Sequence, residues 1–449
     1  MKKENLSDAF EMLDEDIIAS VYKARTESVK KNPRRYLRYI AIAACFCIII
    51  TSVFVGVMNR NIVHAQDLME GIAPNQIEKS DLDALNESVT DFAVRLLKAT
   101  HKDGENTLVS PLSVLCALSM TANGANGETR AQMESVLGMS VEELNEYLYS
   151  YISSRPESEK YKLSIANSIW FKDDGKFVPN RDFLQTNADY YRADIYKAPF
   201  DDSTLDDINN WVERKTEGMI EEILDNIPEE AIMYLVNALA FEAEWEEIYY
   251  EGRIQDRKFI LEDGTKKSVK MMYSNESDYF ETEDSIGFLK YYKDRKYAFA
   301  AILPDEGISI YDYVDSLNGE KINGMLTNIK RGNVCAGMPK FQTEYSDELS
   351  KSLIAMGMTD AFDAESADFG KLGTVSDRNI FIGRVLHKTF ISVDEKGTKA
   401  GAATVVEMLN GTMMEKFIEI NLDRPFVYML IDLETNTPFF IGTMMNPEI

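Results

Sequence analysis

The longest uncharged apolar stretch of the sequence runs from Tyr39 to Met58, twenty residues in all. At about 1.5 Å of rise per residue, a helix of this length spans about 30 Å, the thickness of a bilayer's hydrocarbon core. Basic residues crowd its N-terminal side at positions 30, 31, 34, 35 and 38, whereas Arg60 alone follows it before Asp67. The positive-inside rule therefore predicts a single-pass cell-membrane protein whose transmembrane helix covers residues 39–58, with the N-terminus in the cytoplasm.

The regions flanking this stretch differ in pattern. Residues 7–25 place apolar side chains at helical spacing, which predicts a short amphipathic helix within a cytoplasmic segment, residues 1–38. Residues 59–80 are mixed and polar, as is typical of an extracellular linker. A cleavable signal peptide is the alternative, with Val63-His64-Ala65 as a weak cleavage site, but the polar leader and the apolar run are both long for that pattern.

From residue 81 to residue 449 the pattern is that of a globular domain. Helical periodicity appears at 82–100, 111–123, 128–137, 141–152 and 205–225. Strand-like runs appear at 162–171, 231–242, 298–303, 417–420, 426–432 and 439–444. Helices come early and strands dominate the last sixty residues, so the order predicts an α+β fold with large, mainly antiparallel sheets.

Composition narrows the function. The chain has 75 acidic and 48 basic side chains and a formal net charge of −27, which repels phosphate backbones and excludes a nucleic-acid partner. It has three histidines and neither a Gly-x-Ser-x-Gly, an HExxH nor a phosphate-loop motif, so we expect no enzyme, no metal site and no cofactor. Two of the four cysteines fall within residues 39–58, which is typical of a bacterial-style surface protein rather than a disulfide scaffold.

The segment from Glu395 to Val406 has unusually small side chains. The alternate residues that would share one face of an extended chain are all uncharged: Thr398, Ala400, Ala402, Thr404 and Val406. This pattern fits a buried strand, yet the segment lies where an exposed loop is expected. The composition alone leaves both a linker and an ordinary strand open.

Over residues 81–449 the chain resembles the serpin family. The resemblance is carried, in the family's order, by Asn106–Ser113, Gly124–Thr129, Leu235–Ala238 with Phe241 and Trp245, His387–Phe390 and Asp423–Phe426. It implies a serpin fold with three β-sheets, about nine helices and an exposed reactive-centre loop. It also implies suicide inhibition of serine proteases, in which the protease cuts the loop and is trapped as an acyl-enzyme while the freed hinge inserts into the large sheet.

The resemblance also assigns residues by position. The hinge would comprise Glu395, Lys396, Gly397, Thr398, Ala400, Ala402 and Ala403. A polar cluster beneath the sheet, here called the shutter cluster, would comprise Ser110, Ser113, Asn237 and His387. Trp245 would lie near the point where the loop enters the sheet. Small hinge side chains suit this role, because they must enter a packed interior without overfilling it.

The cleaved bond is bracketed by two counts. Inhibitory serpins usually have seventeen residues from the hinge glutamate to the residue before the cut, and this count from Glu395 ends at Gly411. A common family spacing counted back from Pro425 places the cut nearer Met414. The window for the cleaved bond is therefore Gly411, Thr412, Met413 and Met414. It has no Lys or Arg, which favours elastase-, chymotrypsin- or subtilisin-like targets. We expect a monomer whose partners are a serine protease and, through residues 39–58, the membrane. The alternative is a non-inhibitory serpin acting as a surface binding or sensor module, although such members tend to carry Pro, charge or bulk in the hinge.

Overall fold

The structure is a computed structural model that describes residues 65–80, 83–154, 158, 160–228, 231–376, 379–398 and 417–448. The chain divides into two units, Met1–Ile62 and Val63–Ile449, and all described residues belong to the second. The amphipathic helix predicted within residues 7–25 and the transmembrane helix predicted at 39–58 lie outside the described residues. Within the described ranges, no helix is long and apolar enough to cross a membrane.

The described ranges contain nine α-helices and three 3-10 turns. The helices are α4 (Asn86–Thr100), α5 (Pro111–Ala122), α6 (Gly127–Leu137), α7 (Val141–Ser153), α8 (Arg181–Tyr191), α9 (Asp202–Lys215), α10 (Ile310–Ser316), α11 (Gly319–Thr327) and α12 (Ser350–Ala355). The 3-10 turns are η1 (Asp83–Leu85), η2 (Glu251–Arg253) and η3 (Asp360–Phe362).

Local sequence explains where several helices begin and end. Ser110 caps α5 by accepting a hydrogen bond from the Ser113 N–H, and a capping box formed by Ser140 and Glu143 starts α7. The helix predicted at 205–225 is shorter than expected, because α9 ends at Lys215. Glu217 and Gly218 adopt left-handed backbone conformations, with φ of 52° and 77°, which stop the helix there.

The first large sheet has seven strands in the order β1-β5-β3-β6-β15-β14-β12. Their bounds are β1 (Gln66–Asp67), β5 (Asp194–Ala198), β3 (Tyr161–Lys172), β6 (Met233–Glu244), β15 (Gly397–Thr398), β14 (Arg384–Val393) and β12 (Phe341–Glu348). Strand β6 pairs antiparallel with β3, but it pairs parallel with β14 over seven positions. This boundary between β6 and β14 is called the seam below.

The second sheet has nine strands, with β16-β11-β8-β9-β10-β17-β18-β2 in order and β7 beside β8. Their bounds are β16 (Ile418–Asn421), β11 (Lys330–Pro339), β8 (Lys266–Glu281), β9 (Ser285–Tyr291), β10 (Tyr297–Pro304), β17 (Phe426–Asp432), β18 (Thr437–Met444), β2 (Thr107–Val109) and β7 (Ile254–Ile260). A third, two-stranded sheet pairs β13 (Gly373–Thr374) with β4 (Val178–Pro179). The described part of the chain thus has the predicted α+β architecture.

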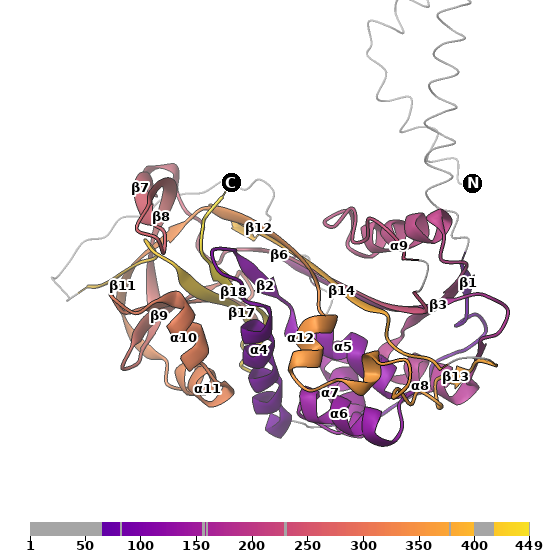
Figure 1. Ribbon diagram of the computed structural model, residues 1–449. Helices are drawn as coiled ribbons and strands as arrows, with labels where there is room; N and C mark the ends of the chain where they lie inside the picture. The colour runs from indigo at the N-terminus through magenta and orange to yellow at the C-terminus, as the bar shows by residue number, and fades with distance from the viewer. Residues whose placement is uncertain are drawn as a thin grey trace, which may run out of the picture. The chain divides into compact units, whose positions relative to one another are not determined.

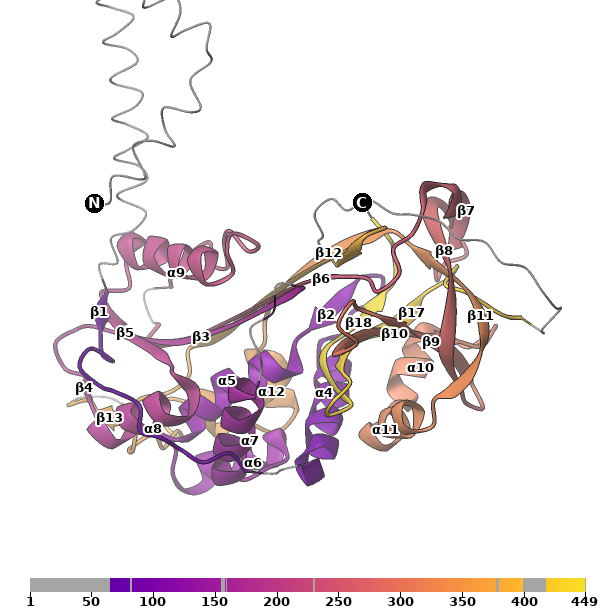
Figure 2. The ribbon, with the colours of Figure 1, turned by 180° about the vertical axis from the view of Figure 1, so that it is seen from behind.

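Helices cover both faces of the seven-stranded sheet. Figures 1 and 2 show α9 on one face and α5 to α8 on the opposite face. Beneath α9, the fully buried Trp211 packs in one cluster with Trp170 from β3 and Tyr234 from β6. The other face joins the main core. A strand that enters this sheet therefore needs small side chains, because packed interiors tolerate little added volume.

Residues 66–75 do not form the tether that their polar composition predicted. Strand β1 pairs antiparallel with β5 at the edge of the sheet. Farther on, the backbone and side-chain N–H groups of Asn75 donate to the two carboxylate oxygens of Asp189, at 2.7 and 3.0 Å. The predicted linker over 59–80 is therefore wrong for this part, since its polar groups find partners in segments more than one hundred residues away.

Candidate functional site

The hinge lies partly inside the seven-stranded sheet. The chain turns back after β14, and Gly397 and Thr398 form β15, which is antiparallel to both β14 and β6. The Thr398 side chain is 0% exposed, and its hydroxyl lies 2.6 Å from that of Tyr292. Thr398 thus lies in the sheet while the loop is uncut, whereas the resemblance implied that the hinge inserts only after cleavage. Thr398 already lies between β6 and β14 at one end of the seam, where the Tyr292 hydroxyl contacts it.

Gly397 fits this place because it lacks a side chain. A Cβ atom there would lie 2.1 Å from the Ala243 carbonyl oxygen, so only glycine allows β15 to approach β6 this closely. The preceding turn is stabilised by Asp394, whose carboxylate oxygen Oδ1 accepts from the backbone N–H groups of Lys396 and Gly397 at 2.8 and 3.2 Å. Local turn chemistry thus directs the hinge back into the sheet.

The turn that follows β6, residues 245–249, donates hydrogen bonds to the backbone carbonyls of residues 394–396. It is called the docking turn. The Trp245 indole donates to the Asp394 carbonyl at 2.9 Å, and the Trp245 backbone N–H donates to the Lys396 carbonyl at 2.9 Å. Between them, the Tyr249 N–H donates to the Glu395 carbonyl at 2.8 Å. Trp245 therefore contacts the chain directly before β15, while its predicted place at the entry of the loop into the sheet stays a prediction.

An ion pair between Lys340 and Glu395 also holds the hinge against the sheet. Lys340, just before β12, lies 2.7 Å from the Glu395 carboxylate, and both side chains are about one-third exposed. The hydrogen bond from Lys340 lowers the pKa of Glu395 below its ordinary value, although partial burial opposes this. The pair joins the hinge to the strand that flanks β14, so it links the two sides of the turn.

The shutter cluster forms where β6, β14 and the start of α5 meet. The Ser110 N–H donates to Nε2 of the fully buried His387 at 3.1 Å, so Nδ1 carries the proton and donates to the Asn237 side-chain oxygen at 2.6 Å. Asn237 in turn donates to Asn167 at 2.7 Å. Burial lowers the pKa of His387 to about 4, so the imidazole is neutral at pH 7. The neutral imidazole, with both nitrogens hydrogen-bonded, connects β14 to β6 across the seam and to the start of α5.

Ser113 contributes less than predicted. Its backbone N–H donates to the Ser110 hydroxyl at 3.3 Å, while its own buried hydroxyl has no hydrogen-bond partner among the described residues. The remaining predicted positions, Ala400, Ala402, Ala403 and the window Gly411–Met414, lie outside the described residues.

Several residues of the site were missed by sequence reasoning. Asn167 is the one amide side chain in β3, beside apolar residues at its centre, which is a signal that could have found it. Tyr292, Tyr249 and Lys340 carry no comparable signal, because their roles depend on which distant segment lies beside them.

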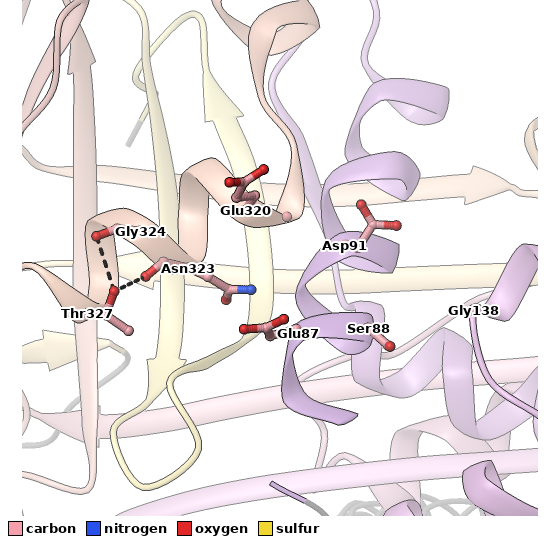
Figure 3. A pocket seen from close by; sticks show the side chains of 9 residues that line it. Glu87, Ser88, Asp91, Gly138, Glu320, Asn323, Gly324 and Thr327 are labelled. Carbon is pink, nitrogen blue, oxygen red and sulfur yellow. Dashed lines mark hydrogen bonds between the residues drawn. The ribbon is translucent and has the colours of Figure 1, made fainter. Parts of the chain in front are cut away.

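A separate groove of about 500 Å³ lies between α4 and α11 (Figure 3). Its carboxylates include Glu87, Asp91 and Glu320, and Asp91 is already paired with Arg95 at 2.7 Å. The hinge and the docking turn contribute no residue to its lining. The groove is therefore not part of the site described above.

Comparison with known proteins identifies the family. The family model described as Serpin (serine protease inhibitor) matches residues 87–447. The chain belongs to the serpin family. Human Serpin B10 is 30% identical over 407 residues, covering 82% of this chain and 100% of its own length. The leukocyte elastase inhibitor of Xenopus laevis is 30% identical over 383 residues, covering 82% of this chain and 100% of its own length.

Solved serpin structures agree with the fold. The thermophilic serpin tengpin in its native state is 48% identical, with a TM-score of 0.83 and coverage of 86% of this chain and 100% of tengpin. Tengpin in its latent state gives a lower TM-score of 0.73 over 83% of this chain and 100% of that structure. The described serpin domain is thus more similar to the native form of that relative than to the latent form.

Proposed function

We propose that this serpin traps serine proteases by inserting its cleaved loop into the seam. The observation that supports the proposal is that Gly397 and Thr398 form a short strand, β15, that pairs antiparallel with both β14 and β6. In the proposed reaction, the protease serine attacks the scissile carbonyl, the new amino terminus leaves, and an ester joins the protease to the hinge side of the loop. Insertion then moves the ester-linked protease away before water hydrolyses the bond.

The register of β15 specifies how the strand would continue. Thr398 lies opposite Val393 of β14 and Ala243 of β6. Continuing both antiparallel ladders places Thr404 opposite His387 and Asn237, which are already register partners across the seam. Insertion would therefore part the shutter cluster and offer the Thr404 hydroxyl to the two groups that it separates.

The sheet gains hydrogen bonds in this exchange. The seam is a parallel ladder of seven register pairs, whereas an inserted strand forms two antiparallel ladders in its place. Antiparallel pairing is also slightly more stable per residue than parallel pairing. At about 1 kcal/mol net per hydrogen bond, roughly seven additional bonds would stabilise the inserted form by about 7 kcal/mol.

The target class follows from the window Gly411–Met414, which contains no basic residue. We expect elastase-, chymotrypsin- or subtilisin-like proteases to be trapped and trypsin to be a poor target. The test mixes the full-length chain in detergent with one protease of each class and looks for a complex that survives SDS. Cleavage by every protease without such a complex would instead favour a non-inhibitory surface binding or sensor module.

The proposed place of action is the cell surface, with the chain anchored through residues 39–58 as a monomer. The support is the uncharged stretch and the basic residues before it. Protease added to intact cells should digest the serpin domain while an epitope within residues 1–38 stays protected. A processed, soluble protein that begins near Gln66 would contradict this topology.

A further inference from the structure

Lys290 is a buried charge that the proposed trapping reaction does not use. It lies on β9 of the second sheet, and only 1% of it is exposed. Its ammonium group donates to the Glu276 carboxylate at 2.9 Å and to the Glu247 carbonyl at 3.1 Å. A lysine is rarely buried so completely unless its charge is paired, and removing one partner of such a pair is strongly destabilising.

The same ammonium group contacts the rings of the docking turn. Its nitrogen lies 4.4 Å from the centroid of the Tyr249 ring and 5.4 Å from that of Trp245, both within cation–π range. Trp245 also stacks on Tyr292, with ring centroids 4.5 Å apart and an interplanar angle of 14°. Lys290 thus contacts the docking turn at its first residue, its middle carbonyl and its last residue.

The docking turn connects Lys290 to the hinge. Trp245 and Tyr249, which pack on the cation, also supply the three N–H groups that donate to the carbonyls of Asp394, Glu395 and Lys396. Lys290 itself donates to Glu276 and Glu247, and it makes no hydrogen bond to the described residues 394–398. Its contacts with Trp245, Glu247 and Tyr249 connect it to the hinge through the docking turn.

We propose that Lys290 is a positioning residue that keeps the docking turn in the conformation that holds Thr398 in the sheet. Its effect on protease trapping rests on the function proposed above. When the hinge is docked, insertion continues a register that already exists. When the turn is loose, insertion begins from a free segment and must first order it, which costs conformational entropy. Slower insertion lets more of the acyl-enzyme be hydrolysed.

The test compares three variants of the full-length chain. Lys290→Met removes the charge and keeps most of the volume. Because this change leaves the Glu276 carboxylate buried without its cation, the double variant Lys290→Met with Glu276→Gln removes both charges and protects against simple misfolding. Lys290→Arg keeps a cation that can stack on the same rings and should restore much of the effect.

A matched control comes from a lysine with similar contacts elsewhere. Lys321 lies 2.6 Å from the Asp284 carboxylate and 4.6 Å from the centroid of the Tyr313 ring. None of these residues belongs to the hinge or to the docking turn. Lys321→Met therefore reports the loss of a lysine, an ion pair and a cation–π contact without loosening the turn.

Two measurements decide the proposal. Hydrogen exchange of the backbone amides of residues 394–398 should become at least tenfold faster in Lys290→Met and in the double variant, and stay unchanged in Lys321→Met. The number of serpin molecules consumed per trapped protease should rise at least threefold in the same two variants and return toward wild type in Lys290→Arg. Unchanged hinge exchange, or faster exchange with unchanged consumption, would overturn the proposal. If the wild type traps no protease, the proposed function fails, and the exchange measurement alone decides the positioning role.

Discussion

Replacing Thr398 with arginine tests whether trapping depends on hinge insertion. The Thr398 side chain is fully buried, and its hydroxyl lies 2.6 Å from the Tyr292 hydroxyl. A guanidinium group in this slot would be desolvated without an anion to pair with, which costs several kcal/mol. The arginine variant should therefore hold its hinge outside the sheet before cleavage and resist its insertion afterwards.

The kinetic consequence can be estimated. If about 3 kcal/mol of this cost is felt in the transition state of insertion, insertion slows by more than about 100-fold, since each 1.4 kcal/mol corresponds to a factor of ten. The acyl-enzyme would then be hydrolysed before it is carried away. Thr398→Arg should be cut at the same bond at a similar initial rate, yet yield free protease and cleaved serpin instead of an SDS-stable complex.

The assay incubates each full-length variant with a protease that the wild type traps, and it quantifies complex and cleaved serpin on SDS gels. Thr398→Ser is the matched control, because it keeps the hydroxyl that faces Tyr292 and loses one methyl group, worth about 0.8 kcal/mol. It should retain most of the complex. An undiminished yield of complex from Thr398→Arg would refute the reasoning, since trapping would then not require Thr398 to enter the sheet.

Three further predictions follow from the seam and the hinge. Cutting the loop within residues 411–414 should raise the unfolding temperature by more than about 10 °C, given roughly 7 kcal/mol of added hydrogen bonding; equal melting of cut and intact chains would exclude insertion. Because the pKa of His387 is lowered to about 4 from an ordinary value of 6.5, the unfolded chain binds more protons between these values, so stability should fall as pH drops from 6.5 to 4. Melting temperatures measured across this range should show the fall, and His387→Gln should flatten it. Glu395→Gln should weaken hinge docking by about 0.5 kcal/mol, as expected for a partly exposed ion pair, and Lys340→Met should add nothing further, which hydrogen exchange of the hinge in the single and double variants can check.

The sequence by itself determined the features that depend on neighbours along the chain. A serine cap followed by proline favours the start of a helix, and the predicted 111–123 agrees closely with α5. Apolar runs separated by turn residues predicted strands such as β17 and β18. The uncharged side chains at alternate positions from Thr398 onwards fitted a buried strand, while the composition alone left a linker open.

Only the tertiary structure decided what those segments meet. The docked hinge depends on the Ala243 carbonyl and on Tyr292, which lies 106 positions from Thr398, so no local pattern could show that the slot is already filled. The polar composition of residues 66–75 predicted a tether. The prediction failed because the partners of these polar groups lie far along the chain. Lys290 is the clearest case: a lysine is ordinarily solvated, and this one is buried because β9 and the docking turn surround its charge with a carboxylate, a carbonyl and two rings. Burial and pairing are properties of contacts between distant segments, and those contacts exist only once the chain has folded.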